Sequence, residues 1–105
     1  MRLQACDVWA VVTNWNGGGR NLDCIESLLD EGFAPERIVF VDNGSSDGSL
    51  GLVRDAHPGL RFLENSTNLG FSEGASMGAT EALAGGCGAV FFVNNDVILL
   101  SGCVE

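Results

Sequence analysis

The sequence predicts an α/β fold: a Rossmann-like open parallel sheet with helices on both faces. Short apolar runs alternate along the chain with segments of helical periodicity, in the order βαβαβαβ. The apolar runs are nearly continuous, which is typical of parallel strands that are buried on both faces. Because the chain has 105 residues and a hydrophobic content of 46%, we expect residues 1–105 to belong to a single domain.

The first part of the chain is expected to form two strands with a helix between them. Residues 8–13, VWAVVT, make the first apolar run, and glycines 17–19 close the turn after it. Asn21 is suited to cap a helix that Gly32 ends, with apolar residues at helical spacing: Leu22, Ile25, Leu28 and Leu29. The second strand is predicted at residues 37–41, RIVFV.

A second helix and a third strand are predicted next. The helix is expected to begin at Ser46 or Asp47 and to end before Pro58. Residues 60–64, LRFLE, alternate between apolar and polar side chains, which indicates a less buried strand.

The last predicted elements are a helix rich in small residues and a fourth strand. Ser72 is placed to cap the helix, which should run to about residue 84. Gly74 and Gly78 within it are expected to allow a close approach to the sheet, at a helix-propensity cost of roughly 1 kcal/mol each. Residues 88–93, GAVFFV, are predicted to form the fourth strand.

Polar side chains follow every predicted strand, at the edge where the carboxyl ends of parallel strands meet. Ligands bind beyond this edge in open α/β sheets. Polar residues also favour turns for conformational reasons, so each cluster alone is consistent with a simple turn. Together they offer an aromatic ring, carboxylates and several amides, which favours a nucleotide site: Asn14, Trp15, Asn16, Asp42, Asn43, Asn65, Asn68, Asn94, Asn95 and Asp96.

Charge and cysteine spacing exclude several classes of function. Five arginines, no lysine and fourteen acidic residues give a net charge of −9, which argues against sequence-independent binding of nucleic acid or an anionic membrane. A phosphate ligand would therefore need a divalent cation to offset the repulsion. Four scattered cysteines without a CxxC pair argue against a zinc site: Cys6, Cys24, Cys87 and Cys103.

Four motifs at the predicted strand ends resemble those of family 2 glycosyltransferases of the GT-A fold. They are VVTNWNG at 11–17, VDNGSSDGS at 41–49, NLGFSEG at 68–74 and FVNNDV at 92–97. Any one motif is weak, but four in this order are specific and cover nearly the whole chain. The resemblance implies inverting transfer of a sugar from a UDP- or dTDP-sugar to an acceptor hydroxyl. A rhamnosyltransferase-like branch and a role in cell-wall or polysaccharide biosynthesis are also implied.

The resemblance further implies which residues bind the nucleotide. Thr13 and Trp15 match positions that bind the base, where an indole ring can stack for about 1–3 kcal/mol; covering the core is the alternative role of Trp15. Asp42 matches a carboxylate that accepts a hydrogen bond from the base, and capping of the following turn is its alternative role. The other nucleotide contacts match Asn14, Asn16, Asn43, Asn68, Gly70 and Phe71.

Asp96 matches the last carboxylate of the family's DXD-type motif, which holds Mg²⁺ or Mn²⁺ against the donor diphosphate. Asn94 and Asn95 match positions beside the donor sugar and diphosphate. Because Asn94 replaces the first carboxylate, we expect a metal that is held weakly until the diphosphate arrives. The sequence departs from rhamnosyltransferase-like relatives again at Glu73 and Ser76, where these carry Gly and Asn; we expect Glu73 to face solvent.

Three alternatives to a glycosyltransferase remain open. A nicotinamide dehydrogenase is disfavoured because Leu22 occupies the last glycine position of GxGxxG. A sugar nucleotidylyltransferase fits better, since residues 17–22, GGGRNL, resemble its phosphate-binding turn, but that family also relies on lysines. The third alternative is a non-catalytic nucleotide-binding module.

No residue matches the family's catalytic base, because members of the family are about twice this long and carry the base and the acceptor site in their second half. We therefore expect residues 1–105 to be the donor-binding part of one domain, inactive by itself and prone to self-association through an uncovered sheet edge. The acceptor can be a glycan, a lipid-linked molecule or a protein. No apolar run has the roughly 18 residues of a membrane span, and we expect a cytoplasmic location, with peripheral contact to the inner membrane face through regions outside this sequence.

Overall fold

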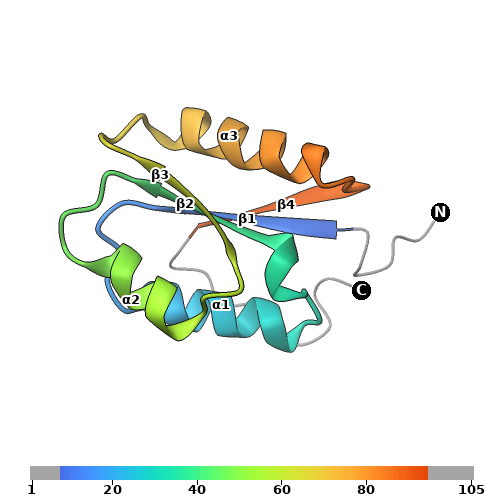
Figure 1. Cartoon of the computed structure of the whole chain (residues 1–105), viewed down its shortest axis with the longest axis horizontal. Helices are drawn as coiled ribbons and strands as arrows, with labels where there is room; N and C mark the ends of the chain where they lie inside the picture. The colour runs from blue at the N-terminus through green and yellow to red at the C-terminus, as the bar shows by residue number, and fades with distance from the viewer. Residues whose placement is uncertain (1–7, 95–105) are drawn as a thin grey trace.

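The computed structural model describes residues 8–94, which form a four-stranded parallel sheet with helices on both faces (Figure 1). The strand order across the sheet is β3-β2-β1-β4. This architecture confirms the predicted fold class, and each predicted strand lies within two residues of its observed bounds. The elements are β1 (Val8–Asn14), α1 (Arg20–Asp30), the 3-10 helix η2 (Pro35–Arg37), β2 (Ile38–Asn43), α2 (Ser49–Ala56), β3 (Arg61–Asn65), α3 (Phe71–Ala84) and β4 (Ala89–Asn94).

The sheet separates two hydrophobic cores. Helices α1 and α2 cover one face and α3 covers the other (Figure 1). Side chains of β1 point alternately to the two sides, so that Ala10 and Val12 pack in the core with α1 while Trp9 and Val11 pack in the core with Ala82 of α3. This arrangement explains why β1 and β2 are almost continuously apolar, since both of their faces are buried.

The start of α1 differs from the sequence prediction. Gly19 is the N-cap residue and Asn21 lies within the first turn, fully buried. The glycine-rich turn already closes with hydrogen bonds from Arg20 N to Gly17 O and from Leu22 N to Gly19 O, so helical bonding begins before Asn21. The predicted end is confirmed: α1 stops just before Gly32, whose φ of 100° is readily adopted only by glycine.

The starts of the other two helices also differ from prediction. Helix α2 begins at Ser49 rather than at Ser46 or Asp47, but Asp47 still serves its start, because Asp47 Oδ1 accepts a hydrogen bond from Ser49 N at 2.9 Å. Helix α3 has Gly70 as its N-cap, so Ser72 lies inside the helix and is not its cap. In both helices a glycine with positive φ turns the chain into the first turn.

Helix α3 packs directly on the sheet, as its small residues predicted. A Cβ atom at Gly78 would overlap the side chain of Val11, and one at Gly74 would lie 2.9 Å from Asn43 Nδ2. None of the helices formed by residues 8–94 is long and apolar enough to cross a membrane.

Candidate functional site

A pocket of about 230 Å³ opens at the carboxyl ends of β1 and β2. Its lining consists entirely of residues that the sequence predicted as ligand contacts: Thr13, Asn14, Trp15, Asn43, Asn68 and Gly70. Three of the four predicted strand-end clusters therefore meet in one place. The fourth strand ends beside them, because Asn94 pairs with Thr13 in parallel register, whereas Asn95 and Asp96 lie outside the described residues.

The indole of Trp15 stands at the pocket and is 56% exposed. The alternative that Trp15 covers the core is wrong, since Trp9 fills that role and is only 4% exposed. A large aromatic ring left in solvent beside a polar pocket is available to stack on a flat ligand.

Asn14, which also lines the pocket, is the centre of a buried hydrogen-bond network. Its side chain is 2% exposed, and each end of the amide bonds to residues from other elements. The two N–H groups of Nδ2 face three oxygens, and Oδ1 accepts two hydrogen bonds. The partners are Asp42 Oδ1 at 2.9 Å, Ser45 Oγ at 3.0 Å, Ser49 Oγ at 2.8 Å, Gly17 N at 2.9 Å and Asn21 Nδ2 at 3.1 Å.

Asp42 belongs to this network and is not part of the pocket lining. It is 3% exposed, with Oδ1 accepting from Asn14 and Oδ2 accepting from Ser45 N at 3.1 Å. The second bond is the turn-capping role that the sequence left open as an alternative. Since neighbouring side chains on a strand point to opposite sides, the next residue, Asn43, reaches the pocket instead.

The loops after β1 and β2 are joined by two further residues. Asn16, predicted as a nucleotide contact, does not line the pocket: its N–H donates to Ser45 Oγ at 2.9 Å, and its Oδ1 accepts from Ser46 N at 2.8 Å. Its backbone has a φ of 53°, a conformation that Asn tolerates better than most residues. Asn16 therefore joins the loops after β1 and β2 and does not contact the pocket directly.

The second residue that joins these loops is Asp47, a role that no pattern in the sequence indicated. Its Oδ2 accepts from Gly18 N at 3.1 Å while its Oδ1 accepts from Ser49 N. Hydrogen bonds from the Ser49 side chain and backbone, followed by the bond from Gly18, lower the pKa of Asp47 below its ordinary value of 3.8. The carboxylate is exposed, so its charged form carries little desolvation penalty.

The loop between β3 and α3 also lines the pocket, through Asn68 and Gly70. Asn68 Oδ1 accepts from Gly70 N at 2.8 Å, and Gly70 O accepts from Asn43 Nδ2 at 3.2 Å. Asn65, at the end of β3, donates from Nδ2 to Asn43 Oδ1 at 2.8 Å. Phe71, another predicted contact, is the first residue of α3 and directly follows Gly70.

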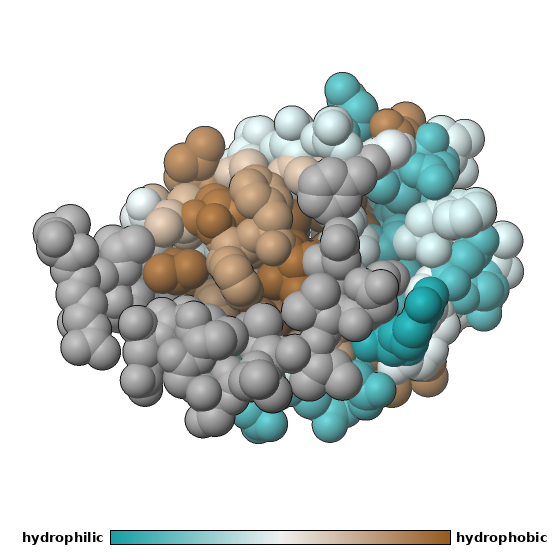
Figure 2. Space-filling view, turned by 180° about the vertical axis from the view of Figure 1, so that it is seen from behind, coloured by the Kyte–Doolittle hydropathy of each residue, from teal (hydrophilic) through white to brown (hydrophobic). Residues whose placement is uncertain are grey.

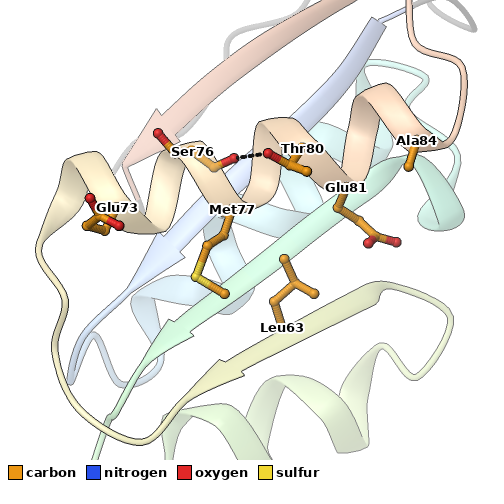
Figure 3. Close-up of a pocket in the computed structure, with 7 residues that line it drawn as sticks. All are labelled: Leu63, Glu73, Ser76, Met77, Thr80, Glu81 and Ala84. Atoms are coloured by element: carbon orange, nitrogen blue, oxygen red, sulfur yellow. Dashed lines mark hydrogen bonds between the residues drawn. The ribbon is translucent and has the colours of Figure 1, made fainter.

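A second pocket, of about 390 Å³, lies between α3 and β3 (Figure 3). Met77 and Leu63 point toward each other across it, and Glu73 and Glu81 of α3 also line this pocket. Glu81 is paired with Arg61 at 2.8 Å, and Glu73 is exposed, as expected. Carboxylates around an apolar groove do not suit a diphosphate, so the polar pocket is the better candidate for a nucleotide.

Comparisons with known proteins identify the family. The model of Glycosyl transferase family 2 matches residues 9–105. Among solved structures, S. aureus TarS is 22% identical with a TM-score of 0.71, and the match covers 86% of this chain and 16% of TarS. The mannosyltransferase PcManGT from Pyrobaculum calidifontis, in complex with GDP-Man and Mn²⁺, is 20% identical with a TM-score of 0.72, covering 90% of this chain and 29% of that one.

A search of curated proteins found no match. The chain spans less than a third of the length of either solved structure, and at these identities the structural likeness shows the fold alone. The family model covers nearly the whole sequence and agrees with the fold, so the chain belongs to glycosyl transferase family 2.

Proposed function

We propose that this chain binds the nucleotide diphosphate sugar of an inverting, metal-assisted glycosyl transfer, with a UDP- or dTDP-sugar as the donor. The observation that carries the proposal is the strand-end pocket, whose six lining residues all lie within the sequence motifs that resemble those of the family. The presence of GDP-Man and Mn²⁺ in the similar mannosyltransferase supports a nucleotide sugar and a divalent cation as the classes of ligand.

In the proposed complex, the base stacks on the exposed ring of Trp15 and meets the amide of Asn43 with its polar edge. Asp42 does not line the pocket, and in this proposal it supports the turn below through the hydrogen bonds that its oxygens accept from Asn14 and Ser45. Asn68 and Gly70 close the opposite wall, where a glycine allows the ligand to approach the backbone.

The proposed metal ligand is Asp96, which follows β4 by two residues. Among residues 8–94, no three His, Cys, Asp or Glu side chains gather into a metal site. The pocket lining supplies hydroxyl and amide oxygens, the hard donors that suit Mg²⁺ or Mn²⁺, but no carboxylate. A bound ion would stabilise the charge that develops on the leaving nucleoside diphosphate.

The lining of the pocket contains no acidic side chain and no histidine. Removal of the proton from an acceptor hydroxyl needs a general base within hydrogen-bond reach, and the lining residues do not provide one. We therefore propose that the chain as it stands binds the donor without transferring its sugar. The same observation favours a non-catalytic nucleotide-binding module as the second candidate function.

Isothermal titration calorimetry with UDP and dTDP tests the binding proposal. We expect both nucleotides to bind with Mn²⁺ present and to bind at least roughly tenfold more weakly in EDTA, because a net charge of −9 repels the diphosphate. Equal affinity in Mn²⁺ and EDTA would rule out the metal role, and absence of binding in both would rule out the nucleotide site.

A transfer assay tests the proposal that the chain binds the donor without transferring its sugar. Radiolabelled nucleotide sugars are incubated with the chain and a panel of glycan, lipid-linked and protein acceptors. We expect slow donor hydrolysis at most. Robust transfer would show that the catalytic base lies within the chain and would contradict the proposal that it only binds the donor.

A further inference from the structure

Helix α3 packs over β1 and β2 and leaves an apolar groove beside β3. The glycines of α3 meet side chains of the two covered strands: Gly78 faces Val11 of β1 and Gly74 faces Asn43 of β2. Leu63 of β3 lies to one side and faces Met77 of α3 across the pocket of about 390 Å³ (Figure 3). Both side chains are half-buried, so apolar surface stays accessible along the groove.

Strand β3 also has a free edge next to this groove. In the sheet formed by residues 8–94, β3 pairs with β2 and has no strand on its other side. The peptide groups of such an edge can bond to an added strand. Because alternate side chains of a strand point to the same face, every second side chain of an added strand would lie over the groove.

Two carboxylates of α3 flank the apolar centre of the groove. Glu73 and Glu81 are eight positions apart with Met77 midway between them, which places them about 12 Å apart along the helix. Glu73 is exposed and forms no ion pair within the described part of the chain. Glu81 accepts a hydrogen bond from Arg61 at 2.8 Å, and a carboxylate can accept more than one. The groove is therefore complementary to an apolar side chain between two cations.

An extended strand can present these groups at the required spacing. Residues four positions apart in a strand lie on one face and are separated by about 13 Å, close to the spacing of the two carboxylates. The matching pattern is a cation, any residue, an apolar residue, any residue and a second cation. A second copy of this chain fits poorly, because both copies carry a net charge of −9 and neither has a lysine.

We propose that the groove between α3 and β3 binds an extended, basic segment of another protein, which adds as a strand to the edge of β3. Its apolar side chain packs between Leu63 and Met77, and its two cations pair with Glu73 and Glu81. The inference does not depend on the proposed nucleotide site, since no residue lines both pockets.

Calorimetric titration with capped peptides of about seven residues, a usual strand length, tests the proposal. The probe has Lys-Thr-Leu-Thr-Lys at its centre. A peptide with Glu in place of both Lys should bind roughly tenfold or more weakly, because it meets two like charges. A peptide with Ser in place of Leu should bind about fivefold or more weakly, because it does not fill the apolar groove. Hydrogen exchange of the amides of residues 61–65 should slow when the lysine peptide binds.

Variants of the chain test the groove and its charge separately. Ser76→Trp, at an exposed position in the pocket lining, should fill the groove and prevent binding. Glu73→Arg should weaken the lysine peptide by about three- to tenfold and strengthen the glutamate peptide. Asp55→Arg is the matched control, since it changes the net charge equally but lies on α2, at the other face of the sheet (Figure 1). Melting temperatures of all variants report whether each one folds.

A pair of N-methylated peptides distinguishes an added strand from a bound helix. One carries N-methyl groups on its odd-numbered amides and the other on its even-numbered amides. An added strand bonds to β3 through one of these two sets, so one peptide should bind and the other should not. Loss of binding in both peptides would show a helix in the groove and would overturn the proposal.

Other results would also contradict it. Equal affinities for the lysine and glutamate peptides would remove the charge complementarity, and unchanged binding to Ser76→Trp would place the peptide elsewhere. Absence of binding of the lysine peptide to the unmodified chain would refute the site. Slowed exchange at residues 61–65 that appears without peptide, and only at high protein concentration, would show that a second copy occupies the edge.

Discussion

Trp9 and Trp15 lie six positions apart and have opposite surroundings. Trp9 packs between the sheet and α3, where the guanidinium of Arg61 lies 4.7 Å from the ring centroid and Gly85 leaves room for the ring. Trp15 follows the last residue of β1 and is 56% exposed at the pocket. Removal of Trp9 should therefore affect stability, and removal of Trp15 should affect binding.

We predict that Trp15→Ala weakens binding of UDP and dTDP by about 5- to 150-fold, the equivalent of 1–3 kcal/mol of stacking. The melting temperature should change little, because the ring is mainly in solvent. Calorimetric titration measures the affinity. Leu83→Ala is the control, since Leu83 is 67% exposed on α3 and does not line the pocket; an equal loss in this variant, or none in Trp15→Ala, would contradict the stacking role.

Asp47 gives a pH prediction at the same scale. Its pKa is lowered in the folded chain by the hydrogen bonds from Ser49 and Gly18, so its contribution to stability is fully present above the ordinary value of 3.8. That contribution is lost as the pH falls through the lower pKa of the folded state. Asp47→Asn should therefore lower the melting temperature at pH 6, and the difference from the unmodified chain should shrink below pH 3.8.

Thermal melts between pH 2 and pH 7 test this dependence on pH. Asp55→Asn, at an exposed position on α2, serves as the control for loss of one negative charge. A difference between Asp47→Asn and the unmodified chain that stayed constant down to pH 2 would show that the carboxylate charge is not what joins the two loops.

At the scale of elements, the distance between α3 and the sheet is set by glycines. Gly78 faces Val11 of β1 and Gly85 faces Trp9, and a Cβ atom at either position would overlap the facing side chain. The loops at the site also approach closely, since a Cβ atom on Gly44 would lie 2.8 Å from the Cα of Thr67. Gly74, near the start of α3, faces Asn43 in the same way, so the close packing of this helix shapes the pocket.

We predict that Gly78→Ala lowers the free energy of unfolding by about 1–3 kcal/mol, because an inserted methyl group overpacks the contact with Val11. Gly51→Ala is a matched control within α2: a methyl group there would meet no neighbouring element within 4 Å, so the substitution should stabilise the chain by up to about 1 kcal/mol. Urea denaturation measures both values. Similar effects in the two variants would mean that α3 does not pack against the sheet as closely as we describe.

At the scale of the whole molecule, β4 is the end strand of the sheet formed by residues 8–94, and it pairs with β1. Phe92 on this strand is 47% exposed. Figure 2 shows apolar side chains gathered on the face of the molecule that lies at the back in Figure 1. An apolar surface of this kind favours association with another chain.

We propose that the chain self-associates through this side, with a dimer fraction that rises with concentration. Light scattering over a hundredfold range of concentration measures it. Phe92→Glu should shift the equilibrium toward monomer, because it places a charge at an exposed apolar position of the end strand β4, whereas Leu52→Glu, at an exposed position on α2, should not. A chain that remains monomeric at every concentration would refute the association.

The sequence by itself determined the order of the elements, the parallel sheet and the position of the site at its carboxyl edge. These features follow from local properties: the spacing of apolar residues, the glycines that end helices, and the polar residues that follow each strand. The same local motifs were enough to indicate the family, which the family model confirms.

Only the tertiary structure decided which polar residue does what within the site. Asp42 and Asn43 are adjacent polar residues whose side chains point to opposite sides of β2, and only the fold shows that the Asp42 side meets Asn14, 28 positions away, while the Asn43 side meets the pocket. Asn21, expected to cap α1, instead bonds to Asn14, and Asn16 joins the second loop. Each outcome depends on hydrogen bonds between loops that are distant in sequence, and the closing of the fold brings those partners together.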